Sequence, residues 1–342
     1  SLRVVGVFNR RMGDMRAGLG AALVGLVVCV GCGREPEAGA PQTQPEARVA
    51  EPPAAVPKPD LPQAPPKVEV AAKKPLAPKL TPEEVAGLPF KDFGGSVQVD
   101  NNGAVVSLTF HRAAIDIALG KPVNRMTNAA LVHLKELTNL QILDLRNTNV
   151  TDAGMVHLKE LTNLEGLDLK DTEVTDAGLV HLEGLTKLKN LIFGWQGKPG
   201  VAGPTDAGLK HLKGLANLER LELKDTAITD AGLVHLKGLT KLTALYSSRK
   251  ITDAGLLHLK GLTNLKRLGL SDTKVTDASL IQLKKLTKLE YLNLSYTEVT
   301  DAGLEHLEGL TNLSWLWLQG TKVSENAVKK LQQALPNCKI QQ

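Results

Sequence analysis

A leucine-containing unit of 24 residues, with the pattern TDAGLxHLKxLTxLxxLxLxxT, recurs seven or eight times between about Leu131 and Leu331. Such self-similarity is the signature of a solenoid, because one unit cannot bury its leucines alone and stacked units share a continuous core. This architecture argues against most enzyme classes. Successive units start at Leu140, Leu164, Leu188, Leu218, Leu242, Leu265, Leu289 and Leu313.

Each unit contains a strand half and a helix half. The unit opens with LxxLxL, in which the last two leucines alternate with polar residues. A period of two predicts a strand with one buried face. After a turn, leucines such as Leu179, Leu182 and Leu185 recur at helical spacing. The sequence therefore predicts an α/β solenoid in which strands and short helices alternate.

Two polar columns mark the ends of these elements. A Thr and an Asp precede each helix, as in Thr175-Asp176 and Thr229-Asp230. Either residue of a pair can cap the free N–H groups of the first turn, and the sequence leaves open which one does. A Thr just after a strand can satisfy backbone groups of the turn with its hydroxyl. Six repeats carry it: Thr148, Thr172, Thr226, Thr273, Thr297 and Thr321.

These motifs resemble those of the leucine-rich repeat proteins. The segment LDLRNT, from Leu143 to Thr148, is similar to the family's LxLxxN/C core, with Thr148 where Asn or Cys is usual. The VTDAGL segments resemble a subtype found in F-box-associated repeats and in many bacterial surface proteins. The resemblance implies a curved right-handed array with a parallel sheet on its concave face and short helices on its convex face. It also implies that ligands bind the concave face.

One repeat departs from the pattern by an insertion. The unit that starts at Leu188 is six residues longer than the others, with GWQGKPGVAGP, from Gly194 to Pro204, between its strand and its helix. A Gly- and Pro-rich insertion predicts a surface loop. This loop is either a lip over the concave face or an insertion that the array tolerates.

Residues 1–32 read as a targeting segment. Arg10, Arg11 and Arg16 precede an apolar run from Ala17 to Gly31, which is short for a membrane span. The pair Gly31-Cys32 resembles the end of a bacterial lipobox, in which the cysteine is lipidated, although Cys29 stands where Leu is usual. The alternatives are an ordinary secretory signal and an uncleaved anchor. Lipidation would make the chain an exported lipoprotein, anchored to the membrane of the bacterial cell envelope.

The remaining segments divide the chain further. Residues 33–80 hold 12 of the 18 prolines and almost no large apolar residues, which predicts a disordered linker. Residues 81–139 predict an N-terminal cap and a degenerate first repeat: Thr81-Pro82-Glu83-Glu84 has the form of a capping box, and Asn102-Gly103 marks a hairpin. Residues 140–342 form the repeats with a C-terminal cap.

Charge and motifs exclude several functional classes. The formal net charge of +5 comes largely from the N-terminal region, and the repeats carry no basic stripe, which argues against nucleic-acid binding. If Cys32 is lipidated, Cys338 is the one free cysteine that remains after the targeting segment. We therefore expect no disulfide framework. No nucleophile elbow, HExxH, phosphate-binding loop or CxxC pair follows Cys32. We therefore expect no catalytic site and no cofactor.

The histidines and the aspartates that recur once per unit suggest the hypothesis of a metal site. Metal sites need ligands that converge, and residues repeated once per unit are more simply elements of the repeat itself. We therefore interpret both columns as structural. The histidines are His133, His157, His181, His211, His235, His258 and His306, and the aspartates are Asp152, Asp176, Asp206, Asp230, Asp253, Asp277 and Asp301.

The three Trp and three Tyr residues form the candidate ligand-binding site. Four of them occupy strand positions between inward leucines and should face the concave groove, and two follow the last strand leucine at its edge. Exposed Trp and Tyr on a rigid surface are typical of binding hot spots, although rings that merely cover the cap would show the same pattern. The predicted site comprises Trp195, Tyr246, Tyr291, Asn293, Tyr296, Trp315 and Trp317.

These observations favour a non-catalytic recognition module that binds a protein or peptide through its concave face. Glycan binding is the second interpretation, since flat aromatic rings flanked by amides and hydroxyls also suit sugars. A third is a purely structural spacer or adhesin without a defined site.

The lipobox-like end generates a first prediction. Mass spectrometry of the membrane fraction from a bacterial host should find a diacylglyceryl adduct on Cys32, and Cys32→Ala should be released from the membrane or remain unprocessed. A wild-type chain that is cytosolic with an intact N-terminus contradicts this localisation.

Overall fold

The computed structural model describes residues 95–110, 126–194 and 203–342. All described residues belong to a single compact unit. Several predicted features lie outside the described residues: the targeting segment with Cys32, the linker, the capping box at Thr81 and most of the Gly194–Pro204 insertion, including Trp195. No helix in the described part is long and apolar enough to cross a membrane.

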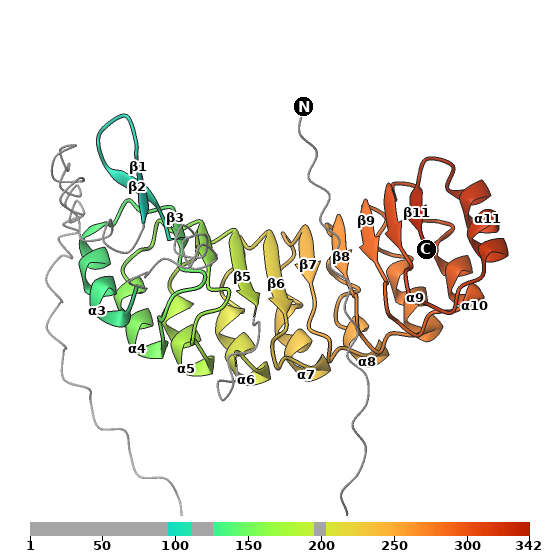
Figure 1. Cartoon of the computed structure of the whole chain (residues 1–342), viewed down its shortest axis with the longest axis horizontal. Coiled ribbons are helices and arrows are strands. Elements are labelled where there is room, and N and C mark those ends of the chain that lie inside the picture. The colour runs from blue at the N-terminus through green and yellow to red at the C-terminus, as the bar shows by residue number, and fades with distance from the viewer. Residues whose placement is uncertain (1–94, 111–125, 195–202) are drawn as a thin grey trace, which may run out of the picture. The chain divides into compact units, whose positions relative to one another are not determined.

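A single sheet runs the length of the repeat array, with its strands in sequence order (Figure 1). The hairpin of β1 (Ser96–Val99) and β2 (Val105–Thr109) is antiparallel, and every later pairing is parallel. The later strands are β3 (Ile142–Asp144), β4 (Gly166–Asp168), β5 (Asn190–Gly194), β6 (Arg220–Lys224), β7 (Ala244–Tyr246), β8 (Arg267–Gly269), β9 (Tyr291–Asn293), β10 (Trp315–Trp317) and β11 (Lys339–Gln341).

Short helices line the opposite side of the array, and the array bends toward the strand side (Figure 1). In most repeats one α-turn continues as a 3₁₀ turn and stops before the third leucine of the predicted helix. The α-helices are α3 (Asn128–Leu131), α4 (Asp152–Met155), α5 (Asp176–Leu179), α6 (Asp206–Leu209), α7 (Asp230–Leu233), α8 (Asp253–Leu256), α9 (Asp277–Leu283), α10 (Asp301–Leu304) and α11 (Glu325–Ala334). The 3₁₀ turns are η2 (Val132–Glu136), η3 (Val156–Leu158), η4 (Val180–Leu182), η5 (Lys210–Leu212), η6 (Val234–Leu236) and η7 (Glu305–Leu307).

The core is a stack of leucine columns between the sheet and the helices. Leu191, Leu221 and Leu245 occupy equivalent positions on adjacent strands, and none of them is exposed. Each fully buried leucine contributes about 1.5–3 kcal/mol relative to an exposed one. Phe110 and Met126 lie in the same core at its N-terminal end, and Leu335 and Cys338 at its C-terminal end.

The threonines after the strands have the role that their position predicts. Each hydroxyl donates to the carbonyl three residues earlier, as Thr148 Oγ1 does to the Leu145 oxygen at 2.6 Å and Thr172 Oγ1 to the Leu169 oxygen at 2.8 Å. The residue before the Thr takes a left-handed conformation in six repeats, including Asn147 at φ 58° and Gly320 at φ 68°. A side-chain hydrogen bond from the threonine therefore closes the turn after the strand in these repeats.

From α6 to α10, the threonine and the aspartate before each helix have different tasks. Thr229 caps its own helix, because its hydroxyl accepts from the Ala231 N–H at 3.4 Å. The Asp206 carboxylate, from the preceding repeat, accepts from the Thr229 N–H at 2.7 Å and from the Thr229 hydroxyl at 2.6 Å. The aspartate therefore fixes the cap of the next repeat through two hydrogen bonds, a contact here called the brace. The pattern within one unit could not reveal this contact between units.

This brace repeats along the whole array. The first member is Asn128, whose amide contacts both the N–H and the hydroxyl of Thr151, and the last is Asp301, which holds Ser324. The glycine of TDAGL makes room for it: a Cβ at Gly255 would lie 2.3 Å from Asp230 Oδ1. The brace pairs are Asp152–Thr175, Asp176–Thr205, Asp206–Thr229, Asp230–Thr252, Asp253–Thr276 and Asp277–Thr300.

Loss of one brace should destabilise the array measurably. Asp230→Ala leaves the Thr252 N–H and hydroxyl without their acceptor, so we expect a loss of about 1–3 kcal/mol in the free energy of unfolding, measured by chemical denaturation. Glu298→Ala, which removes an exposed carboxylate outside the brace, is the control and should stay within about 0.5 kcal/mol of wild type. Equal losses in the two variants contradict the role of the brace.

A candidate recognition site on the strand face

The residues between the inward leucines of the strands form an outward surface, here called the strand face. The parallel register places them in rows that run across the strands. One row contains Arg267, Tyr291, Trp315 and Lys339, from β8 to β11. The neighbouring row contains Tyr246, Gly269, Asn293, Trp317 and Gln341, from β7 to β11.

Four of the predicted aromatic residues meet at one hollow in the C-terminal half of the strand face. This hollow has a volume of about 540 Å³. Because the four side chains come from three strands, no single repeat contains the hollow. Its lining residues are Tyr246, Arg267, Glu290, Tyr291, Ser314, Trp315 and Trp317.

The two tryptophans in the hollow differ in exposure, although the sequence suggested one exposed patch. Their rings stack with centroids 6.4 Å apart at an interplanar angle of 15°. Trp315 is 37% exposed, whereas Trp317 is partly buried and its Nε1 is inaccessible and makes no hydrogen bond. An unpaired buried donor is unfavourable, and the more exposed ring of Trp315 stacks on this partly buried ring.

Cations cover two of the aromatic rings. The Arg220 guanidinium lies 5.3 Å and the Lys224 ammonium 5.7 Å from the centroid of Tyr246, and the Lys339 ammonium lies 4.6 Å from that of Trp315. The position of the Tyr246 ring also depends on the absence of a side chain at Gly269, because a Cβ there would lie 2.6 Å from the ring. These cations were not among the predicted site residues, although they occupy the same outward strand positions as the aromatic residues.

Two other predicted site residues, Asn293 and Tyr296, are not among the residues that line the hollow. Asn293 Oδ1 accepts from the Ser295 N–H at 2.9 Å, so this amide also closes the turn. Tyr296 lies in the turn after β9 and is 63% exposed. Its ring covers Gly320, where a Cβ would lie 2.5 Å from it. Neither residue lines the hollow, and Trp195 falls outside the described residues.

Tyr296 has an unusual backbone conformation. Its φ of 58° is in the left-handed region, which its counterparts in other repeats occupy with Asn, Asp or Gly. A bulky residue there is disfavoured by about 1–3 kcal/mol. The array therefore tolerates backbone strain at an exposed aromatic residue in the turn after β9.

The N-terminal half of the strand face has a different chemistry. A second hollow of about 410 Å³ is lined by Ile142, Ile192, Asp144, Arg146 and Asp168, among others. Arg146 lies 2.7 Å from an Asp144 carboxylate oxygen and 3.4 Å from one of Asp168. Burial raises the pKa of Asp168 above its ordinary value. Arg146 is therefore paired with both aspartates of this hollow, and Glu165 with Lys189.

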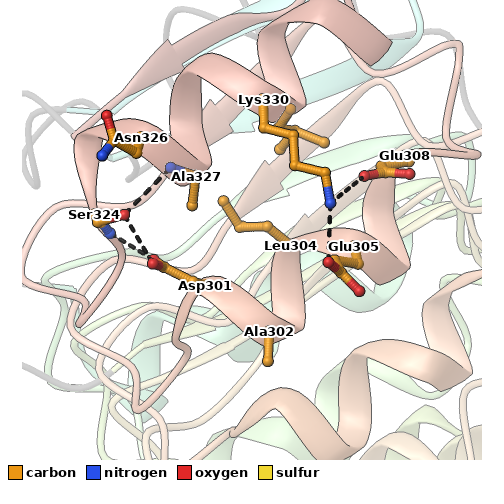
Figure 2. A pocket seen from close by; sticks show the side chains of 10 residues that line it. Asp301, Ala302, Leu304, Glu305, Glu308, Ser324, Asn326, Ala327 and Lys330 are labelled. Carbon is orange, nitrogen blue, oxygen red and sulfur yellow. Dashed lines mark hydrogen bonds and ion pairs between the residues drawn. The ribbon is translucent and has the colours of Figure 1, made fainter.

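A groove on the helix side has a structural explanation. It lies between α10 and α11, with a volume of about 310 Å³ (Figure 2). The Ser324 hydroxyl caps α11 and donates to Asp301, and the Lys330 ammonium lies 2.9 Å from Glu305 and 3.7 Å from Glu308. These contacts join the closing helix to the last repeat.

The histidine column also lies on the helix side, with most rings half buried. His211 contacts the carboxylate of Glu183 in the preceding repeat. Across the described ranges, no three His, Cys, Asp or Glu side chains group closely enough to hold a metal ion.

Comparison with known proteins agrees with this architecture. The Leucine rich repeat family model matches residues 263–323, and a second Leucine Rich repeat model matches residues 136–159 and 214–236. A solved structure of internalin C2 from Listeria monocytogenes is 30% identical, with 66% of this chain and 90% of that chain covered and a TM-score of 0.46. The chain belongs to the leucine-rich repeat proteins, which generally mediate protein recognition and are typically non-catalytic.

Two further structures are similar at lower identity. An internalin, inlF, of Listeria monocytogenes is 19% identical, with 61% of this chain and 76% of that chain covered and a TM-score of 0.34. A structure of PEPR1 with AtPEP1 is 19% identical, with 71% of this chain and 35% of that chain covered and a TM-score of 0.42. The comparison with curated proteins gave no match.

The strain at Tyr296 generates a prediction. Tyr296→Asn places a residue that tolerates the left-handed conformation at φ 58°, so we expect the free energy of unfolding to rise by about 0.5–1 kcal/mol. Glu298→Asn, two residues away and exposed, is the control and should leave stability unchanged within about 0.5 kcal/mol. Destabilisation by Tyr296→Asn in chemical denaturation contradicts the assignment of strain.

Proposed function

We propose that this protein is a non-catalytic recognition module that binds a protein or peptide partner through the C-terminal half of its strand face. Export and lipidation at Cys32, which the sequence predicts, would hold the module at the bacterial cell envelope. The repeat domain would then present its strand face to partners at the membrane surface.

The observation that carries this proposal is the meeting of four aromatic side chains at one hollow. The whole chain has only three Trp and three Tyr, and Tyr246, Tyr291, Trp315 and Trp317 line the same 540 Å³ volume. Large rings on a rigid sheet contribute contact area with little loss of conformational freedom, as in binding hot spots. The partial exposure of Trp315, stacked on the partly buried ring of Trp317, suits such an anchor.

The cations favour a protein partner over a glycan. Sugar rings bind by stacking on a free aromatic face. Lys339 occupies a face of Trp315, and Arg220 and Lys224 occupy the region over Tyr246. A peptide can pass between these groups, contact the rings from the side and pair its own polar groups with the cations. A spacer without a site would need neither the strained Tyr296 nor the clustered rings.

Peptide selection tests the proposal. Random peptides displayed on phage, selected on the immobilised protein, should yield binders whose Kd rises about 30-fold or more in Trp315→Ala, since hot-spot truncation costs about 2 kcal/mol or more. The same change should cost little stability. Leu316→Ala, which truncates a fully buried leucine on the same strand, should instead lose about 2–5 kcal/mol of unfolding free energy.

The matched control is Ile281→Ala, which truncates an apolar side chain that is 47% exposed on the helix side. It should leave the Kd unchanged. Peptides that bind wild type and Trp315→Ala equally would contradict the proposed site, and binding on a glycan array in the absence of peptide binders would favour the glycan alternative.

A further inference from the structure

One row of the strand face alternates charge and apolar surface in an ordered way. Arg267, Tyr291, Trp315 and Lys339 are direct neighbours in the parallel register, on β8, β9, β10 and β11. The row therefore reads cation, aromatic, aromatic, cation. We call these four residues the charged row.

The two cations at the ends of the charged row have no carboxylate partner among the residues that the structure describes. Arg267 lines the hollow and forms no side-chain hydrogen bond or ion pair there. Lys339 contacts the ring of Trp315. Nearby charges are already paired: Arg220 with Glu222, and Glu290 with Lys266. The charged row therefore presents unneutralised positive charge to whatever enters the hollow.

The backbone positions of Arg267 and Lys339 are spaced to match an extended peptide laid across the strands. Adjacent strands lie about 4.8 Å apart, so three steps separate Arg267 and Lys339 backbones by about 14 Å. An extended chain rises about 3.3 Å per residue, and its alternate side chains share one face. Residues four apart in a peptide therefore span about 13 Å and point the same way, with one further side chain midway between them.

Resting on the proposed function, we infer that the partner segment is an extended peptide with two acidic side chains four residues apart and an apolar side chain midway between them. One carboxylate pairs with the Arg267 guanidinium, which suits bidentate binding, and the other with the Lys339 ammonium. The middle side chain contacts Tyr291 and Trp315. A basic segment is disfavoured, because its charges would meet Arg267 and Lys339.

Peptides selected on the wild-type protein test this inference. Their sequences should be enriched in Asp or Glu at two positions separated by three residues, with an apolar residue in the centre. Arg267→Gln and Lys339→Gln should each raise the Kd of these peptides by about tenfold, because a hydrogen bond to a charged group is lost. Arg267→Lys, which keeps the charge, should raise it less. Added NaCl should weaken binding, since both cations are at the surface.

The control for charge is Lys260→Gln, which removes one exposed cation on the helix side and should leave the Kd unchanged. Thermal unfolding checks that each variant is folded. A second measurement needs no variant protein: replacing either acidic residue of the selected peptide by its amide should weaken binding to the wild-type chain by about the same factor as the matching protein change.

The outcomes separate this inference from the proposed function. Peptides that depend on Trp315 but lack the acidic pattern, or that bind Arg267→Gln as tightly as wild type, overturn the inference and leave the recognition site in place. Failure to select any peptide that depends on Trp315 overturns both.

Discussion

The fold depends on how each repeat is joined to the next. The aspartate at the start of one helix reaches across the junction and accepts two hydrogen bonds from the threonine that caps the next helix, as Asp206 does with Thr229. The same threonine hydroxyl accepts from the N–H of its own helix. Because each contact links two repeats, the brace orients the helices on one side while the leucine columns align the strands on the other.

This arrangement frees the strand face for function. The inward strand positions must be apolar to keep the core closed, but the outward positions carry no such constraint. The two halves of the strand face differ in these outward residues. The N-terminal half has paired charges around Asp144 and Arg146, whereas the C-terminal half has aromatic rings and two cations with no carboxylate partner among the described residues. A rigid sheet holds these side chains at fixed spacing, so it can select a partner by the order of its groups.

Two tyrosines of the C-terminal half each pack over a glycine. Tyr246 lies over Gly269 and Tyr296 over Gly320, and in both cases a Cβ would overlap the ring. The glycine belongs to the next repeat each time, so an aromatic residue and its space come from different units. Departures from the repeat pattern are therefore correlated between neighbours, which a comparison of single units does not reveal.

The sequence alone determined the α/β solenoid, the leucine columns and the position of the threonines that close the turns, because period and spacing act within one unit. It also predicted that Tyr246, Tyr291, Trp315 and Trp317 face outward, since strand side chains alternate. It could not assign the helix cap, the unequal burial of Trp315 and Trp317, or the strain at Tyr296. Only the tertiary structure decided that Arg267 and Lys339 flank the aromatic pair, because register between strands places residues far apart in the chain side by side.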